Sequence, residues 1–292
     1  MELWFIYAII ASISIGINGY LIKLLADRKT DGAIVTFFQG LTYLLLGGIG
    51  NSVFGYSWFE MENMIVILFS LSIAIIIFLN LRIRVQALRY LSSSEYYIGY
   101  RIFTTIGLIV VGIAFFHESI SLSQFFGLFL GSIAIALLLE EDRGLRHSRS
   151  WKKACMLLIV SVIAGVVIQI IGKIQGISSL PIPTMLFYQG IMMMLISSVF
   201  DRKKITVFFH GKKNDILLTL VILIPATICV YIAAVYNLLA YSEGGNVSVV
   251  TKILAYSLFV PIILSIVFSQ EKIGYKKTIA FFLTIVSLYY ML

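Results

Sequence analysis

Four cationic side chains interrupt the long apolar runs of this sequence, namely Lys23, Arg101, Lys173 and Lys252. Placing a charge among apolar groups is costly, so such a residue suggests a role in binding or gating. An ammonium or guanidinium group in this setting can bind a carboxylate or a phosphate. A cation near a helix end can also extend towards water along its aliphatic stem. Both interpretations stay open.

Neutral amides form a second group of candidates: Asn18, Gln39, Asn80 and Gln189 lie within apolar runs. Amides there can line a polar cavity and hydrogen-bond a substrate. They can equally join neighbouring helices, at a typical ~0.6 kcal/mol per bond. We therefore take all eight residues as candidates for substrate binding or gating.

The sequence contains no motif for catalysis or for a resident cofactor. It has no phosphate-binding loop, no HExxH and no paired carboxylates within the apolar runs. His117, His147 and His210 lie between runs without ligand spacing, and Cys155 and Cys229 read as small hydrophobic residues inside them. We predict a protein that is not an enzyme and binds no metal or cofactor.

The elements that position these candidates are membrane-spanning helices. Of the 292 residues, 60% are hydrophobic and 12% are charged, and the mean hydropathy is +1.00. The apolar residues come in runs of about 20, the length that a helix needs to cross a bilayer. The net charge of +8 falls mainly in short loops, where it sets orientation and does not indicate nucleic-acid binding.

The sequence predicts an all-α integral membrane protein with ten spans in two sets of five. The first set is Leu3–Leu25, Ala33–Phe54, Met64–Leu81, Ser94–Phe116 and Leu122–Leu139, and the second is Ala154–Lys173, Thr184–Phe200, Ile216–Leu239, Asn246–Ser269 and Ile273–Leu292. Residues 1–140 would form the first repeat, 141–153 a charged connecting loop and 154–292 the second repeat.

The loops indicate an orientation. Lys and Arg cluster in alternate loops, such as Arg28–Lys29 and Arg202–Lys204, whereas Asn51–Asn63 and Ile174–Pro183 carry none. The positive-inside rule places the basic loops in the cytoplasm and both termini outside. The expected location is the cell membrane, as in a bacterial inner or plasma membrane.

The two sets resemble each other. Lys23 and Lys173 lie 150 residues apart, as do the stretches Phe37–Gly40 (FFQG) and Phe187–Gly190 (FYQG). Arg101 matches Lys252 at a spacing of 151, and Glu118 matches Glu271 at 153. Because each set has five spans, the second must enter the membrane upside down, which gives a 5+5 inverted-topology repeat of the kind common in secondary transporters. Lys23 with Arg101, and Lys173 with Lys252, would then flank opposite mouths of a pathway.

Three further features concern helix ends and packing. Glu118 is expected beside the N-terminus of the next helix, where the helix dipole favours an anion. Pro225 and Pro261 predict kinks within their spans. Gly127 and Gly131 permit close packing, either within the chain or at a homodimer face.

Short motifs around the fourth span resemble those of a known family. They are Ala87-Leu88-Arg89-Tyr90-Leu91-Ser92-Ser93, Phe116-His117-Glu118-Ser119-Ile120 and Gln124-Phe125-Phe126-Gly127. With Lys23 late in the first span, they resemble the EamA-type ten-helix branch of the drug/metabolite transporter superfamily. The resemblance implies that four helices of each half surround a cavity and that the fifth and tenth lie at the periphery. The fourth span lacks the central proline of many relatives, and many relatives have both termini inside.

The sequence thus predicts a secondary transporter that moves a small polar metabolite, such as an amino acid, a sugar or an organic anion, by alternating access. A coupling ion or proton is a further expected partner besides the substrate and the lipid bilayer. Two alternatives stay open. One is an exporter of lipophilic cations or drugs, and the other is a non-transporting assembly partner or a subunit of a lipid-linked sugar flippase.

Overall fold

The computed structural model describes residues 2–28, 30–56, 62–87, 93–137, 151–178, 181–211, 213–260, 263–264 and 275–291. Every secondary-structure element with defined bounds in these ranges is helical. The elements are α1 (Leu3–Asp27), α2 (Gly32–Phe54), α3 (Glu62–Ala87), α4 (Ser93–Phe116), α5 (Leu122–Leu137), α6 (Trp151–Ile177), α7 (Ile182–Phe200), α8 (Arg202–Phe209), α9 (Lys213–Ser242), α10 (Val247–Ala255), the 3₁₀ turn η2 (Tyr256–Leu258) and α12 (Tyr275–Met291).

Seven of these helices are long and apolar enough to cross a membrane: α1, α2, α3, α4, α6, α7 and α9. Their outward surfaces carry large apolar side chains, such as Val53, which is 72% exposed, and Phe115, which is 76% exposed. Continuous apolar surface of this kind is unfavourable in water and suits lipid contact. Over the described residues, the prediction of an all-α chain with several helices long and apolar enough to cross a membrane is confirmed.

Individual bounds differ from the predicted spans in informative places. Helix α3 continues past Leu81 to Ala87, and α6 begins at Trp151, inside the predicted connecting segment. The remainder of that segment, residues 141–150, lies outside the described residues. Helix α8 follows α7 directly and had not been predicted. In the ninth predicted span, α10 gives way to η2 at Tyr256. Residues 261, 262 and 265–274 lie outside the described part, and Pro261 and Glu271 are among them.

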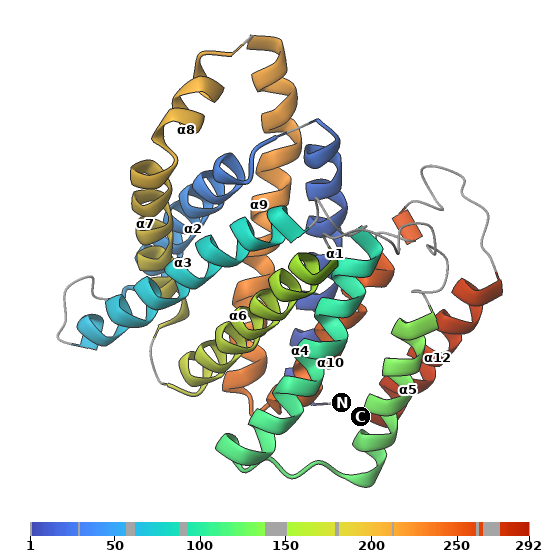
Figure 1. Cartoon of the computed structure of the whole chain (residues 1–292). Coiled ribbons are helices and arrows are strands. Elements are labelled where there is room, and N and C mark those ends of the chain that lie inside the picture. Colours follow the sequence, from blue (N-terminus) through green and yellow to red (C-terminus); the bar gives the residue numbers. More distant parts are fainter. Residues whose placement is uncertain are drawn as a thin grey trace.

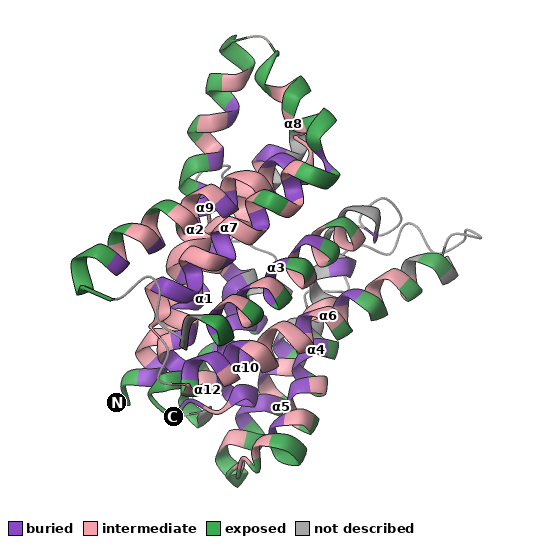
Figure 2. Cartoon of the chain, turned by 90° about the vertical axis from the view of Figure 1, so that its left-hand side faces the viewer, coloured by how far each residue is buried: buried purple, intermediate pink, exposed green. Residues whose placement is uncertain are grey.

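The helices pack in pairs that join distant parts of the chain (Figure 1). Helix α1 lies against α9, α2 against α7, α3 and α4 against α6, and α10 against α1 and α4. Helices α5 and α12 pack on each other and form a pair at one edge of the molecule. All nine residues of α10 are buried, which makes this helix the innermost described element (Figure 2).

Two glycines set the close crossing of α2 and α7. A Cβ on Gly190 would lie 2.6 Å from the carbonyl oxygen of Gly40, and a Cβ on Gly40 would lie 2.9 Å from that of Gly190. Backbone atoms cannot move away as a flexible side chain can, so both positions require glycine. The contact is reciprocal, and it involves the last residue of each copy of the matched sequence stretch.

Candidate functional site

A cavity of about 280 Å³ lies between α1, α2, α3, α6, α7, α9 and α10. Most of its walls are aliphatic, but seven carboxamide side chains line it: Asn18, Gln39, Asn80, Gln169, Gln175, Gln189 and Asn237. Arg84, Tyr43 and Thr227 also contribute, and no Asp or Glu is among the described residues that line it. An apolar wall with a few placed polar groups is typical of a small-molecule site.

Four of the eight predicted site residues meet in this cavity, and they are the four amides Asn18, Gln39, Asn80 and Gln189. Gln39 and Gln189 each directly precede one of the reciprocal glycines of the α2–α7 crossing. The crossing therefore brings the matched glutamines of the two sequence halves to a single site.

The cationic candidates lie elsewhere. Lys252 is fully buried and donates to the Ser132 hydroxyl of α5 at 2.8 Å. An Nη atom of Arg101 lies 3.4 Å from the Ser257 hydroxyl in η2. Neither residue is part of the cavity lining, and these contacts join α10 and η2 to the neighbouring helices. The side chain of Lys23 lies outside the described residues.

Lys173 belongs to a buried latch at the end of the molecule where α6 and α9 terminate. Its ammonium donates to the Gly245 carbonyl oxygen and lies 3.8 Å from the Glu118 carboxylate. Glu118 in turn accepts from the backbone N–H of Val247 at 2.6 Å and from the Ser248 hydroxyl at 3.2 Å. We call these five residues the Glu118 latch.

The helix that Glu118 caps differs from the expected one. The sequence suggests the N-terminus of the next helix, α5, whereas the carboxylate lies at the N-terminus of α10. His117 adopts a positive φ of 51°, a left-handed conformation that redirects the chain just before Glu118. The carboxylate still interacts with a helix N-terminus, but it now joins the α4–α5 turn to the second half of the chain.

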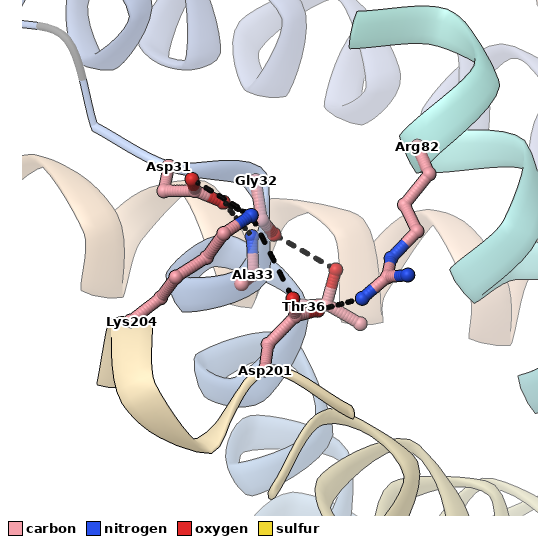
Figure 3. Close-up of polar contacts among 7 residues, drawn as sticks. All are labelled: Asp31, Gly32, Ala33, Thr36, Arg82, Asp201 and Lys204. Atoms are coloured by element: carbon pink, nitrogen blue, oxygen red, sulfur yellow. Dashed lines mark hydrogen bonds and ion pairs between the residues drawn. The ribbon is translucent and has the colours of Figure 1, made fainter. Parts of the chain in front are cut away.

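A different set of charges lies around the α7–α8 junction, at the end of the molecule away from the α4–α5 turn (Figure 1), and Figure 3 shows its contacts. Arg82 of α3 lies 2.6 Å from Asp201, and Lys204 of α8 lies 3.1 Å from Asp31 and 3.6 Å from Asp201. Asp31 also caps α2 by accepting from the backbone N–H of Ala33 at 2.9 Å. We call Asp31, Arg82, Asp201 and Lys204 the basic-side network, because they lie beside the Lys- and Arg-rich loops.

Several cavity amides also bond neighbouring helices. Asn18 donates to the Ala226 carbonyl oxygen of α9 at 2.8 Å, beside the predicted kink residue Pro225. The Asn80 carbonyl oxygen accepts from the Ser161 hydroxyl of α6 at 2.6 Å. Asn18 and Asn80 therefore both line the cavity and hydrogen-bond a neighbouring helix.

A second amide cluster lies near the Glu118 latch. The Gln169 carbonyl oxygen accepts from the Tyr241 hydroxyl at 2.8 Å and from the Asn237 amide nitrogen at 3.3 Å. The Asn237 carbonyl oxygen and the Gln175 amide nitrogen are both buried and have no partner among the residues that the structure describes. Gln175 is only 3% exposed. An unsatisfied buried group of this kind costs about 1–3 kcal/mol.

Gln169, Gln175, Asn237 and Arg84 were not among the predicted site residues. Gln169 and Asn237 are amides inside apolar runs, as are Asn18 and Asn80. Selecting every amide of this kind would therefore have included them. Gln175 and Arg84 lie beyond the predicted ends of their spans, Lys173 and Leu81. Gln175 was missed because α6 continues about one turn past Lys173, to Ile177. Arg84 was assigned to an interfacial helix end, whereas it lies within α3, which continues to Ala87, and lines the cavity.

Comparisons with known proteins give information on the fold alone. No family model matches the sequence, and no curated protein matches it. Among solved structures, 27 chains are similar. One of them, named only as the crystal structure of a protein, has a TM-score of 0.74 over 97% of both chains at 11% sequence identity. The chain therefore shares its whole architecture with a solved structure whose name indicates no activity.

Proposed function

We propose that this chain is a secondary transporter that moves a small polar metabolite across the membrane by alternating access. We further propose that it belongs to the EamA-type branch of the drug/metabolite transporter superfamily. The observation that carries the proposal is the cavity between the long apolar helices, lined by seven carboxamides that include the matched pair Gln39 and Gln189. Gln39 and Gln189 bring polar groups from both halves of the chain to one cavity, as a substrate site between two repeats requires.

The packing pattern supports the ten-helix, 5+5 inverted repeat as part of this proposal. In this repeat, α1 corresponds to α6, α2 to α7, α3 to α9, α4 to α10 and α5 to α12. The helix contacts agree with this correspondence, because α2 packs on α7, α4 on α10 and α5 on α12. The contact between α1 and α9 likewise has its equivalent in the contact between α6 and α3. The reciprocal approach of Gly40 and Gly190 agrees with the same symmetry. An inverted repeat allows one cavity to open alternately to either side.

The cavity chemistry favours a polar metabolite over a lipophilic cation. An exporter of such cations requires an anionic group facing its substrate, and the described lining contains no carboxylate. Among the described residues that line the cavity, Arg84 is the one with a cationic side chain. The assembly-partner alternative would be supported by a cavity that water cannot enter.

Transport by the purified chain in proteoliposomes tests the proposal. Labelled amino acids, sugars and organic anions are supplied outside, and initial uptake is compared between the parent, Gln189→Leu and Gln124→Leu. Gln124 is a matched control because its amide caps α5 by accepting from Ser121, away from the cavity. We expect uptake of at least one solute, reduced about tenfold or more by Gln189→Leu, the factor for 1.4 kcal/mol, and unchanged by Gln124→Leu. Absence of uptake for the whole panel, or equal loss in both variants, would contradict the proposal.

A further inference from the structure

The segment between α7 and α9 is basic and contains the short helix α8 (Figure 1). From Asp201 to Lys213 it has five Lys or Arg residues and one acidic residue. The two flanking helices are both long and apolar enough to cross a membrane. In the membrane, this connecting segment therefore lies at a bilayer surface.

Exposed apolar residues on the flanking helices indicate the depth of α8. Val199 and Phe200, the last two residues of α7, are exposed, as is Leu217 of α9. Leu217 lies four residues after the first residue of α9, which is about 6 Å along the helix axis. The headgroup region adds about 5–8 Å to each side of the hydrocarbon core. Helix α8 is therefore at the depth of the lipid headgroups.

The inner face of α8 is fixed to the rest of the protein. Lys204 lies 3.1 Å from Asp31 and 3.6 Å from Asp201. One turn later, the ring of Phe208 contacts the ring of Phe38 on α2, with 6.1 Å between their centroids. Residues four apart lie on the same face of a helix, so these contacts determine which way α8 is turned.

The outer face of α8 carries two further cations. Arg202 and Lys203 are exposed, and within the described residues no ion pair joins either of them to a carboxylate. Val207 lies one turn after Lys203, and therefore beside it, and is 71% exposed. Cations next to an exposed apolar side chain are typical of a helix that lies in the membrane interface.

We propose that the outer face of α8 binds the headgroup of an anionic phospholipid. Arg202 and Lys203 donate charge-assisted hydrogen bonds to its phosphate oxygens, and Val207 contacts the adjoining acyl chain. An anionic lipid is favoured over a zwitterionic one because each basic residue near an anionic surface contributes roughly fivefold in affinity. The site requires that the chain is inserted in a membrane, and it does not depend on transport.

Lipid binding by the purified full-length chain tests the proposal. The chain in mild detergent is titrated with dioleoyl phosphatidylglycerol, dioleoyl phosphatidylcholine or glycerol 3-phosphate, and bound molecules are counted by native mass spectrometry. We expect phosphatidylglycerol to bind about thirtyfold more tightly than phosphatidylcholine, at roughly fivefold for each of two cations. This preference should shrink in roughly 1 M ammonium acetate, where the Debye length is about 3 Å. Equal binding of the two lipids, or equally tight binding of glycerol 3-phosphate, would overturn the proposal.

Variants assign the preference to the outer face. The double variant Arg202→Gln, Lys203→Gln should remove most of the preference for phosphatidylglycerol. Lys203→Gln alone should weaken its binding by about fivefold, and Lys204→Gln is the matched control, because it removes the same charge from the paired, inner face. Equal losses for Lys203→Gln and Lys204→Gln would indicate only a diffuse attraction to the basic segment and would overturn the assignment.

The unfolding midpoint in lipid-free detergent shows whether the variants stay folded. Arg202 and Lys203 are exposed, so the double variant should unfold at the same temperature as the parent. If it does not fold, the lipid preference of the parent and its loss in high salt still decide the proposal.

Discussion

The two ends of the molecule are held by charges of very different exposure. In the basic-side network, Asp201 is 6% exposed, but the side chains of its partners Arg82, Lys204 and Asp31 are 44%, 53% and 41% exposed. In the Glu118 latch, the side chains of Lys173 and Glu118 are 9% and 5% exposed. Exposed ion pairs contribute little and are screened by salt, whereas a buried charge that loses its partner is strongly destabilising.

This difference suggests that the two ends have different roles. The latch ties α6, the α4–α5 turn and the start of α10 through buried atoms, so separating them leaves groups unsatisfied. The network ties α2, α3 and the α7–α8 junction through groups that water can solvate once they part. We therefore predict that the basic-side end opens at lower cost.

The largest expected effect is at the latch. Lys173→Met leaves the Glu118 carboxylate buried without its cation and should destabilise the chain by about 3 kcal/mol, at the lower bound for breaking a buried pair. Thermal unfolding in detergent measures it. The double variant Lys173→Met, Glu118→Gln removes the unpaired charge and should recover part of the loss. An unfolding midpoint equal to that of the parent in the single variant would remove the contrast between the two ends.

A smaller effect is expected at Asp201, the buried member of the basic-side network. Its carboxylate is 6% exposed and serves both Arg82 and Lys204. Asp201→Asn keeps the shape and weakens both contacts, for a loss of about 1.5–2 kcal/mol, at the lower end of the range for hydrogen bonds to charged groups. The same unfolding measurement applies. A loss larger than that of Lys173→Met would reverse the comparison.

The smallest effect is expected for Lys204→Ala, whose side chain is half exposed. The loss should be about 0.5 kcal/mol or less, as for surface ion pairs, and it should disappear in roughly 1 M salt, where the Debye length falls to about 3 Å. Unfolding midpoints at low and high salt test this, with Lys203→Ala on the same exposed helix as the control. A loss that persists in high salt would show that Lys204 acts through burial.

Much of this architecture follows from local sequence properties. The first eight predicted spans coincide with helices because runs of about 20 apolar residues carry their own signal. The shared Gln-Gly stretch was recognised as part of the repeat, since glutamine and glycine are conspicuous among apolar residues, but the α2–α7 crossing that it forms was not predicted. Four of the seven cavity amides were selected for the same reason.

What could not be predicted depends on which way each side chain faces. Lys252 and Gln39 look alike in sequence, as single polar residues in apolar runs, yet one contacts α5 and the other lines the cavity. The partner of Glu118 is 129 residues distant, and no local pattern specifies such a contact. Helix α8 is short, with basic residues followed by apolar ones, so its placement of Lys204 against Asp31 and Asp201 depends on tertiary packing.

Access of water to the cavity tests the central claim most directly. Ala234 lines the cavity, so Ala234→Cys is introduced with Cys155→Ser and Cys229→Ser, which leaves one thiol. Sealed vesicles are then treated with a membrane-impermeant thiol reagent on the outside only or the inside only. Alternating access predicts labelling from either side, slowed by a transported solute. Labelling from neither side, or from the same single side under all conditions, would contradict it.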